Sequence, residues 1–189
     1  MGAAAKPVAR DETTGRGAPR EGRAPTVAAL AESIKAELGD EWLPLLYRER
    51  VKPLRTRAFR LPAAAKNSAD VEVQHTLLGV ELRVGRRRVS CPDLATARYL
   101  AVFARAGCAE VAVPYDITKV SRLADELERA WQRTMLLAEH LAAGRPQAFR
   151  TRLKKFIVGL AREGVLAEGA GAAVPAFNQN TRQRRRAGS

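Results

Sequence analysis

Residues 71–113 read VEVQHTLLGVELRVGRRRVSCPDLATARYLAVFARAGCAEVAV, and this stretch decides the fold class. Apolar and polar residues alternate over 71–84 and again over 89–91, the period-two pattern of strands that bury one face. Residues 85–88 (GRRR) form the turn between these strands, and Gly79 is a candidate bulge. The pattern predicts a β-hairpin with an arginine-rich tip.

A helix and a further strand follow the hairpin. Pro92 and Asp93 open the helix, Gly107 closes it, and residues 110–113 are a short apolar strand. A strand, helix and strand in this order normally cross over right-handedly and place the two strands in parallel. The sequence therefore predicts an α+β fold: a ββαβ sheet unit flanked by N-terminal helices and a C-terminal helical pair.

Two short helices are predicted ahead of the sheet unit. Thr26 is a candidate N-cap for the first helix, which ends at Gly39. Asp40 is a candidate cap for the second helix, which reaches Tyr47. Residues 48–66 are predicted to be a basic connector, because two prolines disfavour a continuous helix there.

The longest helix is predicted to begin at Thr118. Its apolar residues keep an a/d spacing for three heptads, with a third apolar position that widens the stripe. This width favours packing in a globular core, and homodimerisation through the 120–141 helix is the alternative. Gly144 and Pro146 end this helix, and a last helix is predicted over 147–162.

One folded domain is predicted over residues 26–168, since 189 residues suit a single domain of ordinary size. Residues 1–25 and 169–189 mix Gly, Ala, Pro and Arg without an apolar period, so both ends are predicted to be disordered. The domain divides into a helical part with the connector (26–66), the ββαβ unit (67–116) and a second helical part (117–168).

Positive charge is concentrated in a few segments. Thirty-three Lys and Arg residues against 20 Asp and Glu give a net charge of +13, which makes a polyanion the first partner to consider. Residues 48–66 carry seven basic residues and one acidic residue, and 169–189 carry four basic residues and none that is acidic. On the last helix five cations precede the first acid, Glu163, whereas solvated helices usually mix the two signs. The candidate nucleic-acid contacts are Arg55, Arg57 and Arg60; Arg86, Arg87 and Arg88; Arg150, Arg152, Lys154 and Lys155; and Arg182, Arg184, Arg185 and Arg186.

Aromatic residues are scarce, at 5% of the chain, which disfavours the reading of single strands by stacking. Phe59 and Phe149 lie beside basic residues, where they could stack on bases, but the anchoring of a core is the favoured role for both. Duplex or structured nucleic acid is therefore the preferred partner, with DNA and RNA left open.

A metal site is the alternative at the end of the sheet unit. If the strands that end at Cys91 and Val113 are parallel, Asp93 and Asp116 meet at one sheet edge with Lys119 one turn away. Two carboxylates and a lysine could bind a divalent ion and support phosphodiester cleavage. Both aspartates also stand where a helix N-cap is needed, and capping is the favoured explanation.

Familiar catalytic patterns are missing from the sequence: it holds no P-loop, no GxGxxG after a strand, no HExxH and no GxSxG. Cys91, Cys108, His75 and His140 match no zinc spacing, so no metal and no cofactor are predicted. The two thiols are expected to be free in a reducing cytosol.

The sequence thus predicts a non-catalytic nucleic-acid-binding protein. A metal-dependent nuclease that uses Asp93 and Asp116 is one alternative, and an oligomeric scaffold that docks acidic protein partners is another. The absence of a long apolar run and of a signal-peptide pattern predicts a cytoplasmic protein without a membrane partner, for which the nucleoid and the ribosome are candidate locations. The arginine- and alanine-rich composition is typical of a GC-rich bacterial genome.

Overall fold

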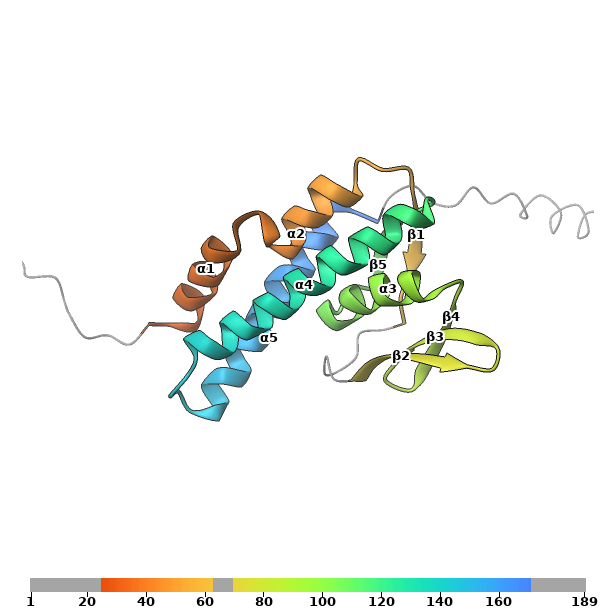
Figure 1. The fold of residues 1–189 in the computed structure, drawn as a ribbon. Coiled ribbons are helices and arrows are strands. Elements are labelled where there is room, and N and C mark those ends of the chain that lie inside the picture. The colour runs from red at the N-terminus through yellow and green to blue at the C-terminus, as the bar shows by residue number, and fades with distance from the viewer. Residues whose placement is uncertain (1–24, 63–69, 171–189) are drawn as a thin grey trace, which may run out of the picture.

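The computed structural model describes residues 25–62 and 70–170 of the chain. Long helices make up most of the molecule, and two small antiparallel sheets lie towards one end (Figure 1). This arrangement confirms the predicted α+β class. The elements are α1 (Val27–Leu38), the 3-10 turn η1 (Gly39–Glu41), α2 (Leu43–Leu46), the π-helical turn η2 (Tyr47–Val51), β1 (Thr56–Arg60), β2 (Val71–Thr76), β3 (Gly79–Val84), β4 (Arg87–Cys91), α3 (Leu94–Ala106), β5 (Glu110–Pro114), α4 (Ile117–Leu141) and α5 (Gln147–Glu168).

Helix α1 begins and ends where the sequence predicts. The Thr26 hydroxyl accepts a hydrogen bond of 3.2 Å from the backbone N–H of Ala29, which satisfies a free donor of the first turn. Gly39 ends the helix with a φ of 51°, a conformation that glycine adopts without strain. Ile34 and Leu38 are among its buried residues, so this short helix is held by the core.

The second helical segment begins and ends later than predicted. Trp42, not Asp40, precedes α2, and helical structure continues through η2 to Val51. The predicted connector over 48–66 therefore contains the end of a helix and the strand β1. The sequence does not predict β1, because four of its five side chains are half-buried and neither face of the strand is fully buried.

Residues 71–91 form a three-stranded antiparallel meander instead of a single hairpin. A turn at Leu77 and Leu78 separates β2 from β3, and Gly79 begins β3 instead of forming a bulge. The second turn, at Gly85 and Arg86, leads into β4 and carries the predicted arginine-rich tip.

Strand β5 does not join this meander. It pairs antiparallel with β1, with Ala58 opposite Ala112, so the prediction of parallel strands at Cys91 and Val113 is wrong. The physical reason lies on the other edge of β5. The Tyr47 hydroxyl accepts a 2.8 Å hydrogen bond from the N–H of Ala112, and the Tyr99 hydroxyl donates one of 2.6 Å to its carbonyl. Two side chains thus use the backbone groups that a further strand would need.

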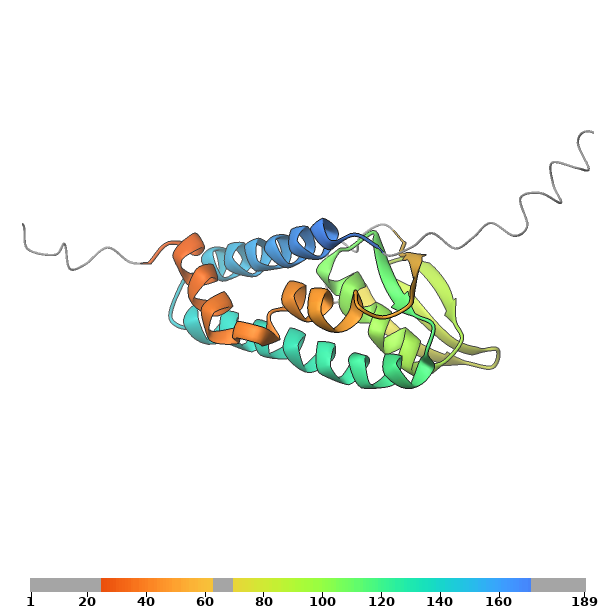
Figure 2. The same cartoon turned by 90° about the horizontal axis from the view of Figure 1, so that it is seen from above.

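The heptad-spaced face of α4 lies in the core, as the favoured interpretation predicts. Helices α1, α3 and α5 all pack against α4, and Figure 2 shows the α2 segment lying between α4 and α5. The apolar stripe that suggested homodimerisation is therefore already covered within one chain. Its buried members are Val120, Leu123, Ala124, Leu127, Ala130, Trp131, Thr134 and Ala138.

Helix α5 continues to Glu168, past the predicted end at Arg162. Gly169, which follows α5, is held against the η2 segment, because its carbonyl accepts hydrogen bonds from Tyr47 (2.9 Å) and Lys52 (3.4 Å). Nowhere in the described ranges is a helix both long and apolar enough to cross a membrane.

Candidate nucleic-acid interface

Asp93 and Asp116 both cap helices. The Asp93 carboxylate accepts hydrogen bonds from the N–H (2.7 Å) and the hydroxyl (2.8 Å) of Thr96 at the start of α3. The Asp116 carboxylate accepts from the N–H (3.0 Å) and the hydroxyl (2.7 Å) of Thr118 at the start of α4. The hydroxyl bond is the main reason why the pKa of Asp116 lies below its ordinary value. Capping therefore accounts for both carboxylates.

The nuclease alternative required Asp93 and Asp116 to meet at one sheet edge, at the ends of two parallel strands. Strands β4 and β5 lie in different sheets, so they do not form that edge. Lys119 is exposed on the first turn of α4. Within residues 25–62 and 70–170, no group of three or more His, Cys, Asp and Glu side chains is placed to hold a metal ion.

Arg55 and Arg57 meet the ring of Tyr115 where β1 begins and β5 ends. The N–H of Tyr115 donates a 3.1 Å hydrogen bond to the carbonyl of Arg55, which continues the pairing of the two strands. The guanidinium carbons of Arg55 and Arg57 lie 5.4 and 6.0 Å from the centre of the Tyr115 ring. Cation–π attraction therefore holds two like charges at one exposed aromatic side chain. We call these three residues the Arg55 cluster.

The Arg55 cluster lacks a counterion among the described residues, because no carboxylate oxygen there lies within 4.0 Å of either guanidinium. The Nε of Arg57 is also buried without a hydrogen-bond acceptor. Two guanidinium groups that share a ring repel each other, and a phosphate that accepts from both would remove that repulsion. Arg60, the third predicted contact on β1, instead pairs with Glu110 at 3.8 Å.

The arginines of the β3–β4 turn are all exposed. Arg88 pairs with Glu81 at 3.6 Å, whereas Arg86 and Arg87 have no carboxylate partner in the described part of the chain. Behind the tip, the polar face of the meander is paired internally, for example by Arg83 and Glu72 at 2.8 Å. Only the tip of this sheet therefore offers free cations.

The predicted cations on α5 are of two kinds. Lys154 donates to Glu139 on α4 at 2.5 Å, a bond that lowers the pKa of Glu139. Arg150 donates to Gln147 at 3.4 Å. Arg152 and Lys155 are exposed and, among the residues that the structure describes, have no carboxylate within 4.0 Å. Of the four predicted contacts on α5, these two make no ion pair and no side-chain hydrogen bond within the described residues.

Phe59 and Phe149 are half-buried and pack against the core, which confirms their predicted anchoring role. Tyr115 is the aromatic residue that sequence reasoning did not connect with the arginines. No local signal could have revealed it, because its neighbours come from β1, which precedes it by more than 50 residues.

Within the described residues, the free cations of the predicted sets occupy three separate places. The Arg55 cluster lies at the start of α4, the β3–β4 turn lies at the tip of the meander, and Arg152 and Lys155 lie on the first half of α5. This half of α5 follows the far end of α4, whose 25 residues span about 37 Å (Figures 1 and 2). A single compact basic surface is therefore not formed by these groups. Arg182, Arg184, Arg185 and Arg186 lie outside the described residues.

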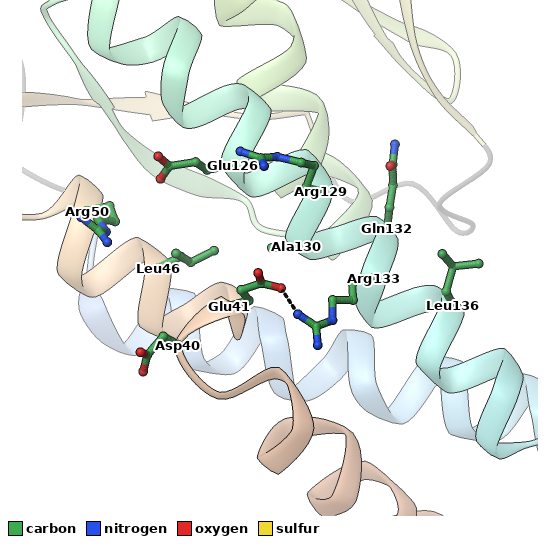
Figure 3. Close-up of a pocket in the computed structure, with 10 residues that line it drawn as sticks. All are labelled: Asp40, Glu41, Leu46, Arg50, Glu126, Arg129, Ala130, Gln132, Arg133 and Leu136. Carbon is green, nitrogen blue, oxygen red and sulfur yellow. Dashed lines mark hydrogen bonds and ion pairs between the residues drawn. The ribbon is translucent and has the colours of Figure 1, made fainter.

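A groove of about 500 Å³ lies between α4 and the segment from η1 to η2 (Figure 3). Asp40, Glu41 and Glu126 line it together with Arg50, Arg129 and Arg133, and the Glu41–Arg133 ion pair of 2.6 Å joins its two walls. Since the charges of these residues balance, the groove does not favour a polyanion.

Comparison of the chain with protein-family models, with curated proteins and with solved structures found no match.

Proposed function

We propose that the protein binds nucleic acid without catalysing a reaction on it, through phosphate contacts made by separate groups of free cations. The Arg55 cluster is the observation that carries this proposal, because its two guanidinium groups converge without a counterion in the described residues. Guanidinium groups donate two parallel hydrogen bonds to phosphate oxygens, as they do to carboxylates, and the net charge of +13 favours a polyanion such as nucleic acid as the source of the anion.

Duplex or structured nucleic acid is the proposed form of the ligand. Proteins that bind single strands use successive aromatic rings as stacking platforms. The exposed aromatic residues in the described ranges are Tyr115 and Phe156, and Tyr115 already carries two arginines on its ring. Phosphate contacts to a duplex need no such rings. A nucleic-acid partner would place the protein in the cytoplasm, at the nucleoid or at the ribosome.

The test is the salt dependence of binding, measured by fluorescence anisotropy with labelled duplex DNA, single-stranded DNA and structured RNA. The Arg55→Gln/Arg57→Gln variant should bind duplex more weakly, and the slope of log K against log salt should become shallower by about 0.9 for each phosphate contact that is lost. The matched control is Arg122→Gln/Arg133→Gln, which removes the same charge from two exposed arginines that already have carboxylate partners.

The control variant should keep a slope closer to that of the parent protein. If the slope of log K against log salt becomes shallower by the same amount in both variants, net charge alone determines binding and the Arg55 cluster is not a binding site. If the parent protein binds none of the three ligands at low salt, the proposed function is wrong.

A further inference from the structure

Leu77 and Leu78 are the most exposed large apolar residues in the described ranges, with relative exposures of 107% and 95%. They form the two-residue turn between β2 and β3. Neither leucine has a positive φ, so the turn does not require glycine at these two positions, but polar residues are usual in turns and two leucines there contribute no burial to the core. A residue that departs from the local sequence preference and adds nothing to the packing of the core is typical of a functional position.

The leucine turn is held in a defined conformation. The hydroxyl of Thr76 donates a 3.2 Å hydrogen bond to the carbonyl of Gly79 and accepts one of 3.3 Å from the N–H of Leu78. Gly79 has a φ of 128°, which a residue with a side chain rarely adopts. The turn therefore presents its leucines on a preorganised tip, and little conformational freedom would be lost on insertion into a ligand.

The end of the molecule that carries this turn is rich in exposed apolar residues. His75 lies opposite Val80, and Val80 lies opposite Cys91, so the turn is beside the end of β4, from which the chain enters α3. Helices α3 and α4 both start at this end (Figures 1 and 2). Five of the eight exposed large apolar residues in the described ranges lie on these three segments: Leu77, Leu78, Leu94, Tyr115 and Ile117.

The same end of the molecule also carries free cations. Arg55 and Arg57 lie at Tyr115, and Lys119 lies on the first turn of α4, none with a carboxylate partner among the described residues. The aspartates at this end, Asp93 and Asp116, are engaged in helix caps. A ligand that has phosphate groups and a narrow apolar gap for the leucine side chains is therefore complementary to this end of the molecule.

We propose that the leucine turn is a wedge that enters a base step of a duplex and bends it, while the cations at the same end contact the flanking phosphates. This inference rests on the proposed nucleic-acid binding. A two-residue tip is too narrow for the roughly 800 Å² per partner of a stable protein interface, whereas leucine side chains do fit between partly unstacked bases. The cost of unstacking is lowest at flexible pyrimidine–purine steps, so these are the expected sites.

The test uses a duplex of about 25 base pairs that contains TA and CA steps and carries a donor and an acceptor fluorophore at its two ends. The parent protein should raise the energy transfer, because a bend brings the ends together. Leu77→Ser/Leu78→Ser should keep the salt slope of binding and a Kd within about tenfold of the parent, and should leave the duplex straight. Leu136→Ser, at an exposed leucine on α4, is the matched control and should bend the duplex as the parent does.

The outcomes separate the two proposals. Binding by the parent without a bend, or a bend that survives the double serine substitution, overturns the wedge and leaves nucleic-acid binding intact. Failure of the parent to bind any duplex overturns both. Sedimentation with phosphatidylcholine vesicles that contain phosphatidylserine is the parallel measurement: partitioning that depends on Leu77 and Leu78 would assign the turn to a lipid surface and overturn the wedge.

Discussion

The hydroxyl oxygen of Tyr47 accepts a 2.8 Å hydrogen bond from the backbone N–H of Ala112, a residue 65 positions further along the chain. The same hydroxyl donates a 2.9 Å bond to the carbonyl of Gly169. One buried side chain therefore joins η2, the edge of β5 and the end of α5. Because tyrosine hydroxyls occupy this edge of β5, the β1–β5 sheet does not join the meander. The pairing of β5 with β1 instead places Tyr115 beside the arginines of β1.

Tyr47→Phe should lower the free energy of unfolding by about 1–3 kcal/mol, because the N–H of Ala112 is left buried without an acceptor. Urea denaturation followed by circular dichroism measures this change. Tyr115→Phe, which removes a hydroxyl from an exposed ring, is the control and should change stability little. Equal effects of the two substitutions would contradict a special role for the Tyr47 bond.

Stability should fall at alkaline pH. Burial raises the pKa of Tyr47 from 10.0 to about 12 and that of Cys108 from 9.0 to about 12. The unfolded chain therefore loses these protons first as the pH rises, so their contribution is complete below pH 9 and is lost between pH 9 and 12. Urea midpoints across this pH range measure the decline, and it should be shallower in Tyr47→Phe/Cys108→Ala. An unchanged pH profile in that variant would show that other groups cause the decline.

Two glycines of α5 should respond in opposite ways to alanine. A Cβ at Gly164 would lie 2.6 Å from the Cγ of Pro44, so Gly164→Ala should push α5 away from α2 and destabilise the fold by about 1–3 kcal/mol. Gly159 has no atom within 4 Å of such a Cβ, so Gly159→Ala should stabilise the helix by about 0.5–1 kcal/mol. Thermal unfolding of both variants tests the pair, and a loss of stability in Gly159→Ala would contradict the packing described for α5.

Helices α1, α3 and α4 were predictable because the signals that start them are local. Thr26, Asp93 and Asp116 each cap a helix through a residue two or three positions ahead, so a short window of sequence contains the whole interaction. The pairing of β1 with β5 joins segments more than 50 residues apart, and nothing near Arg55 indicates that Tyr115 lies beside it. The arginine sets were predictable as cations, but their ion pairs come from other elements, so the sequence alone could not show which of them are free.

On α5, Arg152 and Lys155 should contribute more to nucleic-acid binding than Lys154, which is paired with Glu139. Arg152→Gln/Lys155→Gln should flatten the salt dependence of nucleic-acid binding, because both residues are exposed without a carboxylate partner in the described ranges. Lys154→Gln breaks the bond to Glu139 and should change the slope less. Anisotropy titrations of the two variants measure the difference, and a larger effect of Lys154→Gln would show that the ion pair opens to the ligand.

Replacement of Asp116 by Asn separates binding from metal-dependent chemistry. Asparagine is a competent N-cap, so the start of α4 should persist and the melting temperature should change little. Nucleic-acid binding should persist or tighten, because one negative charge leaves the end of the molecule that carries the Arg55 cluster. Purified parent protein should show no magnesium-dependent cleavage of a labelled duplex. Cleavage that both EDTA and Asp116→Asn abolish would instead identify Asp116 as a metal ligand and the protein as a nuclease.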